Sequence, residues 1–248
     1  MNAIILAAGD GTRMGRLTTE LPKPLIDVNG ISIIERQINN LRQNSISKII
    51  IITGTNHKKF NISNVEYIYD ENSKSHDQLG SLMCAKNNFC DDILIIFGDI
   101  IFEESILTQI LESDDDIVLA VDRDWKKSYV KRTNNSFDDA DKVTIQNDKA
   151  IRIFKNFNES DDESNIGEFL GLMKLSKKGS IKLYECYQKL MLSHSGTFHD
   201  AESLEKAKLI DLLQELLEQQ IEINTISITG KWCEIDTEQD LSFAKETF

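Results

Sequence analysis

The sequence predicts an α/β fold in which a mainly parallel sheet carries helices on both faces. Three short apolar runs, at residues 3–7, 48–53 and 93–97, have the continuous hydrophobicity of strands that are buried on both faces. Segments with apolar residues at helical spacing separate these runs. Strands that alternate with helices form parallel sheets, and such sheets bind ligands at the carboxyl ends of their strands.

The first half of the chain alternates strands and helices from its start. Ser32 and Glu35 have the spacing of a capping box, and apolar residues at helical spacing follow them, which predicts a helix at residues 32–44. The same patterns predict helices at 79–89 and 103–112 and strands at 3–7, 48–53, 65–69, 93–97 and 116–121. Gly9 and Gly98 each follow a strand of this set, so we expect them to lie close together.

The second half contains a predicted β-hairpin. Asn147-Asp148 is typical of a tight turn, here between strands at 142–146 and 150–155. Further strands are expected at 167–175, 222–228 and 231–235, and further helices at 180–192, 202–219 and 238–248. No linker interrupts the chain. We therefore expect residues 1–248 to form one domain, in which the C-terminal half adds a smaller substrate-binding or lid layer.

The overall composition narrows the classes of function. The chain has 248 residues, with 28 Lys and Arg against 41 Asp and Glu, which gives a net charge of −13. An acidic surface disfavours nucleic acid as a partner, and any anionic substrate requires a local concentration of positive charge. No apolar run has the length of a membrane span, and no signal peptide is expected. The four cysteines are scattered, which favours free thiols in the cytoplasm.

Positive charge gathers in the turn that follows the first strand. Gly9 and Gly11 allow backbone N–H groups to approach an anion, and Arg13, Arg16 and Lys23 come soon after them. The glycine spacing is one residue too long for the dinucleotide fingerprint, and no P-loop motif occurs in the chain. We interpret this stretch as a phosphate-holding loop, with an ordinary glycine turn as the alternative.

Carboxylates occur at two other strand ends. Asp99 follows Gly98 directly after an apolar strand, where a carboxylate is costly unless it is solvated, paired or bound to a cation. Glu234 and Asp236 alternate along a short strand and therefore share one face of it. Helix capping is the alternative for both sites, with Asp236 and Thr237 placed before the last helix.

Two stretches of this sequence resemble the signature of nucleotidyltransferases that activate sugar phosphates and related phosphorylated metabolites. The first stretch is Leu6, Ala7, Ala8, Gly9, Asp10, Gly11, Thr12 and Arg13, and the second is Pro22, Lys23 and Pro24. The resemblance implies a Rossmann-like mixed, mainly parallel sheet with a nucleotide-binding half at 1–122 and an acceptor-binding and lid half at 123–248. It also implies that the glycine loop and Arg13 hold the triphosphate, while Lys23 neutralises phosphates at the reaction centre and contacts the acceptor.

The same resemblance implies a magnesium cofactor. Asp99 and Asp236 are its expected ligands, and Glu234 is a weaker candidate. Mg²⁺ takes few carboxylates and keeps positions for phosphate oxygens and water. Arg16 stands where sugar-phosphate members of the family commonly have proline, which weakens the assignment of a sugar phosphate as the acceptor.

Several other stretches are similar to the CTP-dependent branch of this family that acts on small phosphonates. They lie at residues 79–85, 97–102, 120–132, 138–141 and 167–171. This similarity implies a nucleobase pocket at Asp77, Gly80 and Ser81, with Asp99 also at the nucleotide. The candidates for contact with the acceptor share mixed charge beside an aromatic ring, and a plain charged turn is their alternative interpretation. They are Asp122, Asp124, Trp125, Lys126, Arg132 and Glu168.

The expected reaction is transfer of CMP from CTP to a small anionic phosphonate or phosphate, with release of pyrophosphate. The acceptor resembles 2-aminoethylphosphonate, phosphocholine or phosphoglutamine. An acceptor oxygen that is already ionised needs no general base, and no Ser/His/Asp or Cys/His constellation is evident. Sugar-1-phosphate nucleotidyl transfer from UTP or dTTP is one alternative, and a non-catalytic nucleotide sensor is another. The sequence makes no prediction of the oligomeric state.

Overall fold

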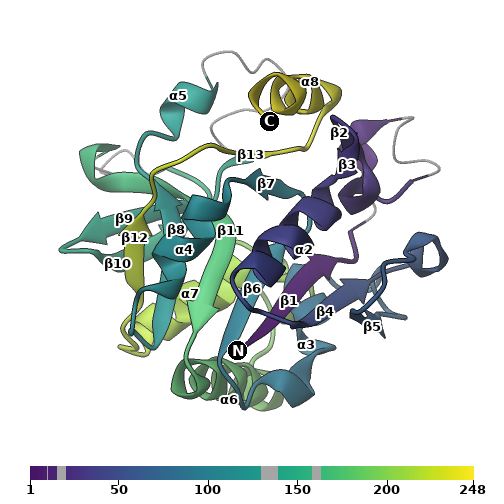
Figure 1. Ribbon diagram of the computed structural model, residues 1–248. Coiled ribbons are helices and arrows are strands. Elements are labelled where there is room, and N and C mark those ends of the chain that lie inside the picture. Colours follow the sequence, from purple (N-terminus) through teal and green to yellow (C-terminus); the bar gives the residue numbers. More distant parts are fainter. Residues whose placement is uncertain (10, 16–20, 130–138, 158–162) are drawn as a thin grey trace.

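The computed structural model describes residues 1–9, 11–15, 21–129, 139–157 and 163–248. A nine-stranded sheet runs through it in the order β5-β4-β1-β6-β11-β8-β12-β10-β9 (Figure 1). Its strands are β1 (Asn2–Ala7), β4 (Lys48–Thr53), β5 (Glu66–Tyr69), β6 (Ile93–Phe97), β8 (Ile117–Asp122), β9 (Lys142–Gln146), β10 (Lys149–Phe154), β11 (Ile166–Leu175) and β12 (Asn224–Ser227).

The sheet is mixed, as predicted, and it is parallel from β5 to β6. β1 pairs in parallel with both β4 and β6, and β5 adds to β4 in the same direction. β11 lies antiparallel between β6 and β8, so the second half of the chain extends the same sheet. β9 also pairs with β11, and the strands β11, β8, β12, β10 and β9 therefore curl back on themselves.

The central strands form because their side chains are almost entirely apolar. The isoleucines at positions 49 to 52 in β4 and 93, 95 and 96 in β6 are at most 1% exposed. Each such side chain contributes roughly 1.5–3 kcal/mol when it is fully buried. The continuous apolar runs in the sequence thus correspond to strands covered on both sides.

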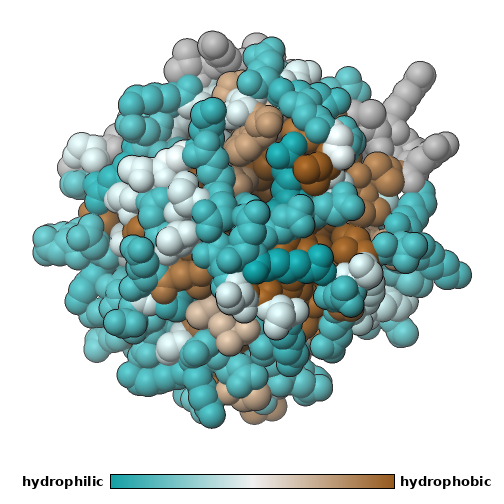
Figure 2. All heavy atoms as spheres, in the orientation of Figure 1, coloured by the Kyte–Doolittle hydropathy of each residue, from teal (hydrophilic) through white to brown (hydrophobic). Residues whose placement is uncertain are grey.

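Helices cover both faces of the sheet. In Figure 1, α2 (Ile33–Gln43) and α4 (Glu104–Leu111) lie in front of it and contact each other. The opposite face carries α3 (Gln78–Met83), α6 (Lys177–Ser193) and α7 (Leu209–Glu218). None of the helices in the described ranges combines the length and the apolar character that crossing a bilayer requires. The surface in Figure 2 is largely hydrophilic, in agreement with the charged composition.

A smaller layer lies above the carboxyl ends of the central strands. It contains the pair β2 (Asp27–Val28) and β3 (Ile31–Ser32), the pair β7 (Ile100–Phe102) and β13 (Trp232–Glu234), and the helix α8 (Glu238–Thr247). Met14, Ile101 and Ile235 are fully buried in the core of this layer. That core fixes the N-terminal loop and β13 side by side.

Local signals in the sequence explain several element boundaries. The predicted capping box at α2 is present: Ser32 Oγ accepts from the Glu35 N–H at 3.3 Å, and the Glu35 carboxylate accepts from the Ser32 N–H at 3.1 Å. The hairpin turn is confirmed, with φ of 51° at Asn147 and 57° at Asp148.

Three predicted helices differ from the observed ones. Residues 202–219 do not form one helix. A 3₁₀ turn occupies Leu204–Lys206, and α7 starts only at Leu209. The Asp211 carboxylate caps this start by accepting from the Lys208 N–H at 2.7 Å. The helix predicted at 79–89 is split into α3 and a 3₁₀ turn at Lys86–Asn88. Helix α6 begins before residue 180, because Ser176 Oγ caps it by accepting from the Gly179 N–H at 3.1 Å.

The remaining short elements are one turn of helix each. They are α5 (Lys126–Tyr129) and 3₁₀ turns at Thr12–Met14, Lys23–Leu25, His57–Lys59 and Glu163–Asn165.

Candidate active site

A cavity of about 480 Å³ lies at the carboxyl ends of β1 and β6. The first loop and the turn at Gly98 meet there, because the Gly98 N–H donates to the Leu6 carbonyl at 2.9 Å. A Cβ atom at Gly98 would lie 2.6 Å from that carbonyl oxygen, so the close approach requires glycine. The loop residues that line the cavity are Leu6, Ala7, Ala8, Gly9, Gly11 and Arg13.

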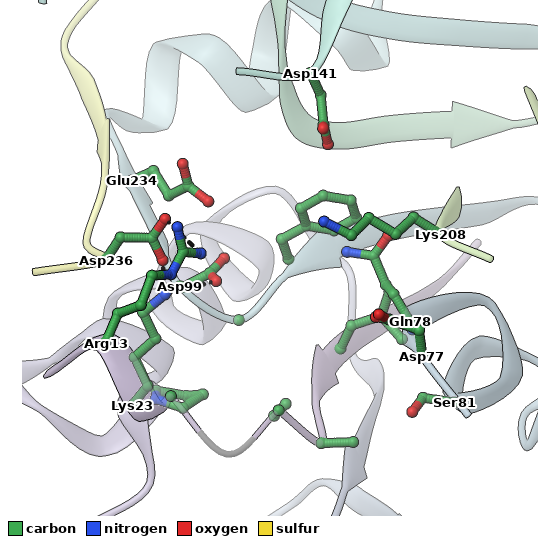
Figure 3. A pocket seen from close by; sticks show the side chains of 18 of the residues that line it. Arg13, Lys23, Asp77, Gln78, Ser81, Asp99, Asp141, Lys208, Glu234 and Asp236 are labelled. Atoms are coloured by element: carbon green, nitrogen blue, oxygen red, sulfur yellow. Dashed lines mark hydrogen bonds and ion pairs between the residues drawn. The ribbon is translucent and has the colours of Figure 1, made fainter. Parts of the chain in front are cut away.

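Lys23 joins the two predicted acidic positions. Its Nζ lies 2.9 Å from Asp99 Oδ2 and also contacts Asp236 Oδ1. Arg13 reaches the other oxygen of Asp236 at 2.8 Å, and Figure 3 shows these side chains gathered on one side of the cavity. Lys23 begins a 3₁₀ turn between two prolines and is only 7% exposed, so the backbone holds its side chain toward the carboxylates.

The electrostatics of this group are dominated by close charges of opposite sign. Burial alone would lower the pKa of Lys23, but the carboxylates of Asp99, Asp236 and Glu234 outweigh it and raise the pKa above its usual value. Burial raises the pKa of Glu234 well above its usual value, and the neighbouring carboxylates of Asp236 and Asp99 raise it further. Lys23 is therefore a permanent cation, and the carboxylates beside it are crowded.

The same carboxylates have the chemistry of a magnesium site. Asp99, Glu234 and Asp236 each offer an oxygen, and these oxygens lie within 4.8 Å of one another. The Oδ1 atom of Asp99 is buried and has no hydrogen-bond partner among the described residues. A divalent cation would satisfy that oxygen and would relieve the crowding at Glu234, so this donor set fits Mg²⁺.

The chain path explains why these carboxylates meet. β13 pairs antiparallel with β7, which directly follows Asp99, and the Ile235 N–H donates to the Asp99 carbonyl at 3.0 Å. Thr237 Oγ1 caps α8 by accepting from the Asp240 N–H at 3.3 Å. The capping role thus belongs to Thr237, and Asp236 keeps its carboxylate for Lys23 and Arg13.

Two of the predicted nucleobase residues, Asp77 and Ser81, belong to a second wall, seen on the right of Figure 3. Asp77 and Ser81 line the cavity, together with Gln78, which the sequence analysis did not single out. Gly80 lies behind this wall, because a Cβ atom there would meet the ring of His76 at 2.4 Å. No pattern in the sequence distinguished Gln78 from any exposed glutamine.

A third wall contains cations that the sequence analysis missed. Lys155 and Lys208 line the cavity with Asp139 and Asp141, and Lys155 Nζ is 3.6 Å from Asp141 Oδ1. Burial would lower the pKa of Lys155, but Asp141 and its other polar neighbours raise it overall. Burial raises the pKa of Asp141, although Lys155 and Lys208 oppose this. The curled pairing of β9 with β11 brings the end of β10 to this position.

Most of the predicted acceptor residues lie elsewhere. Asp122 accepts from the indole N–H of Trp232 at 2.9 Å, and the exposed Asp124 pairs with Lys127 at 2.8 Å. Trp125 is 1% exposed because its large apolar ring packs in a small core with Tyr129.

Neither Trp125 nor Lys126, whose Nζ lies 5.8 Å from the centre of a Trp125 ring, is among the residues that line the cavity. Asp122 and Asp124 are not among them either. Glu168 does line the cavity and accepts from the Tyr129 hydroxyl at 2.6 Å. Asp10, Arg16 and Arg132 fall outside the described residues, as does the side chain of Thr12.

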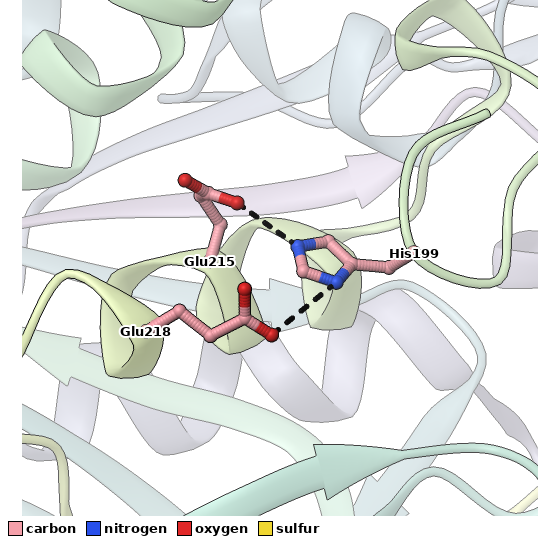
Figure 4. A group of neighbouring side chains, drawn as sticks. All are labelled: His199, Glu215 and Glu218. Atoms are coloured by element: carbon pink, nitrogen blue, oxygen red, sulfur yellow. Dashed lines mark hydrogen bonds and ion pairs between the residues drawn. The ribbon is translucent and has the colours of Figure 1, made fainter. Parts of the chain in front are cut away.

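A second group of potential metal ligands lies outside this cavity. His199 is 3.1 Å from Glu215 and 3.8 Å from Glu218, two residues of α7 (Figure 4). Each ring nitrogen faces a different carboxylate, and contact between a histidine and two glutamates accounts for this arrangement without a metal.

Comparison with known proteins identifies the family of this chain. Residues 3–219 match a family described as the MobA-like NTP transferase domain. The chain belongs to this family. Its resemblance to nucleotidyltransferases and its α/β fold are thereby confirmed, and it is a nucleotidyltransferase by family.

Several relatives match over different lengths. A CTP:phosphoglutamine cytidylyltransferase from Campylobacter jejuni is 27% identical over 97% of this chain and 98% of its own. A choline-phosphate cytidylyltransferase from Haemophilus influenzae is 36% identical over 43% of this chain and 47% of its own. The bifunctional protein GlmU of Methanococcus maripaludis is 38% identical over 48% of this chain, which covers 29% of that protein.

Solved structures share the fold over nearly the whole chain. The CTP:phosphocholine cytidylyltransferase of Streptococcus pneumoniae superposes with a TM-score of 0.74 at 20% identity, covering 99% of this chain and 97% of that one. The inositol-1-phosphate CTP transferase of T. maritima gives 0.73 at 21% identity, covering 99% and 96%.

Proposed function

We propose that this protein is a Mg²⁺-dependent cytidylyltransferase that transfers CMP from CTP to a small phosphonate or phosphorylated metabolite and releases pyrophosphate. The observation that carries the proposal is the position of Lys23 between Asp99 and Asp236 beside the glycine loop. The names of relatives that act with CTP on phosphoglutamine and choline phosphate support the choice of nucleotide.

The chemistry requires two anions to approach each other. An acceptor oxygen attacks the α-phosphorus of CTP, the new P–O bond forms, and the bond to pyrophosphate breaks. Lys23 and Arg13 lower the repulsion by facing the phosphates, and the glycine loop offers backbone N–H groups to them. A phosphonate or phosphate oxygen is ionised at neutral pH, so no side chain has to remove a proton from it.

The carboxylates of Asp99, Asp236 and Glu234 would hold Mg²⁺ in this scheme. The ion, when bound, supplies positive charge to the phosphate oxygens and fixes their orientation. Lys23 and Arg13 keep their own role as cations that border the same space.

The third wall of the cavity suits an acceptor that carries more than one charge. Lys155 and Lys208 offer positive charge there, and Asp139, Asp141 and Glu168 offer negative charge. We propose that this wall contacts the acceptor, in place of the turn at Asp122 to Lys126. A 2-aminoethylphosphonate-like, phosphocholine-like or phosphoglutamine-like molecule meets both signs of charge. We further propose a cytoplasmic location, in keeping with four free cysteines.

The decisive assay is pyrophosphate release from CTP in the presence of Mg²⁺ and a panel of small phosphonates and phosphomonoesters. We expect turnover with at least one acceptor of the panel and none without acceptor. Turnover only of a sugar 1-phosphate with UTP or dTTP would instead support the sugar nucleotidyltransferase alternative. Binding of CTP with no turnover of any acceptor would support a nucleotide sensor.

A further inference from the structure

Asp70 is a buried carboxylate that stands directly after β5, behind the second wall of the cavity. It is 1% exposed, and its Oδ2 accepts from the Ser81 hydroxyl at 2.7 Å. Its Oδ1 accepts from the Asn72 N–H at 3.0 Å and lies 3.1 Å from His76 Nε2. One carboxylate therefore fixes three points of the segment between residues 70 and 81.

His76 continues this network toward the cavity. Its Nδ1 lies 3.1 Å from the Asp77 carbonyl oxygen, so both ring nitrogens face acceptor oxygens. Whichever ring nitrogen carries a proton donates to the oxygen that it faces. The ring also occupies the space beside Gly80, where a Cβ atom would lie 2.4 Å from it. The position of the ring thus depends on Asp70 and on the absence of a side chain at residue 80.

The segment that Asp70 organises supplies a large part of the cavity wall. Ser73, His76, Asp77, Gln78 and Ser81 all line the cavity. A separate hydrogen bond holds this segment to the chain before α7, since the Asp77 N–H donates to the Glu205 carbonyl at 2.9 Å. Asp70 holds the segment to the end of β5 through its own contacts.

This wall adjoins the glycine loop. A Cβ atom at Gly54 would lie 2.4 Å from the Ala8 carbonyl oxygen and 3.0 Å from Ser73 Oγ, so the two loops almost touch across Gly54. Ser73 Oγ is buried and has no hydrogen-bond partner among the described residues, although it lies at the cavity. A hydroxyl in that state needs a partner, and a nucleotide held at the glycine loop would supply one.

From these contacts we infer that Asp70 is a positioning residue for the nucleotide, acting through His76 and Ser81. The inference rests on the proposed function, because it assumes that CTP occupies this cavity. It assigns a role to a residue that does not line the cavity. Without the Asp70 carboxylate, His76 and Ser81 lose this partner. The nucleotide then binds a wall that is no longer held in place.

The test compares Asp70→Ala and Asp70→Asn with the wild type in steady-state kinetics. We expect Asp70→Ala to raise the KM for CTP about tenfold or more, which is the usual consequence of removing the partner of buried polar groups. We expect kcat to change by less than about threefold and the KM for the acceptor by less than about twofold, because Lys23 and Lys155 are untouched. The KM for CTP of Asp70→Asn should lie between those of the wild type and Asp70→Ala, since an amide of the same shape still accepts from the Asn72 N–H.

His199→Gln is the matched control. This substitution also breaks a contact between a histidine and carboxylates, but His199 does not line the cavity. The KM of this variant for CTP should therefore stay within about twofold of the wild type. Circular dichroism and thermal melts report whether each variant is folded at the assay temperature. If Asp70→Ala does not fold, then Asp70→Asn and Ser81→Ala carry the test, and each should raise the KM for CTP severalfold.

The results separate the inference from the function it rests on. A wild type that turns over CTP, together with a folded Asp70→Ala variant of unchanged KM for CTP, overturns the inference alone. A fall in kcat with no change in this KM overturns it as well. A wild type that is inactive with CTP and every acceptor overturns the proposed function; equilibrium titration with CTP then tests the inference directly, which fails if wild type and Asp70→Ala bind equally.

Discussion

The two halves of the sheet build the cavity in different ways. In the first half, parallel strands end in glycine turns, and the functional side chains follow those turns in the sequence. In the second half the strands curl, because β9 pairs with β11 as well as β10, and side chains from distant positions such as Lys155 and Lys208 reach the cavity. A site at the end of a parallel strand is therefore visible in the sequence, whereas a site made by sheet curvature is not.

The largest expected effect concerns the first half. Lys23→Ala removes the cation that contacts both Asp99 and Asp236, and we expect kcat to fall by about a thousandfold or more. The measurement is pyrophosphate release at saturating CTP and acceptor. Lys127→Ala is the control, since that exposed lysine pairs only with Asp124 in the described contacts and should change kcat by less than about twofold. Wild-type activity in Lys23→Ala would remove Lys23 from the reaction centre.

The second prediction tests the carboxylates around the proposed magnesium site. Asp99→Asn should lower kcat by about a hundredfold and raise the Mg²⁺ concentration needed for half-maximal rate, because an amide oxygen binds the ion more weakly than a carboxylate. Chelation of the metal should abolish wild-type turnover, and added Mg²⁺ should restore it. Asp115→Asn changes an exposed aspartate away from the cavity and should leave both quantities unaltered. Full activity of the wild type in excess chelator would contradict the metal assignment.

Lys23 and Asp99 could be assigned from the sequence. Gly9, Lys23, Asp99 and Asp236 were all assigned because each lies beside a strand end or a turn with a recognisable pattern, and the structure brings them together. The capping box at Ser32 and the turn at Asn147 were predictable for the same reason: their signals are local. Trp125 was assigned to the acceptor because its neighbours are charged, but burial of its ring decides its position.

The third prediction concerns the second half, where two assignments compete. Lys208→Ala should raise the KM for the acceptor about tenfold and leave the KM for CTP nearly unchanged, because this cation belongs to the third wall. Lys178→Ala, which breaks an exposed pair with Asp116, is the control. If Lys126→Ala raises the acceptor KM and Lys208→Ala does not, the acceptor binds at the charged turn, as the sequence first suggested.

The smallest expected effect is a pH dependence of stability at Asp141. Burial raises the pKa of this carboxyl above its usual value of 3.8, so the folded state holds the proton more tightly than the unfolded state. The contribution is therefore greatest at low pH and is lost as the pH rises through the folded-state pKa. Asp141→Asn should flatten this dependence at pH values above the usual pKa of 3.8, measured by denaturant unfolding. An unchanged slope would show that Asp141 titrates as it does in the unfolded chain.

The curl of the second half also determines which edge of the large sheet is open to pairing with another β-strand. β9 returns to pair with β11, so that side of the large sheet offers little free backbone. At the opposite side, β5 pairs with β4 alone among the described strands, and Tyr67 and Tyr69 are 38% and 43% exposed. Strand addition, whether in assembly or in aggregation, would therefore begin at the outer margin of β5.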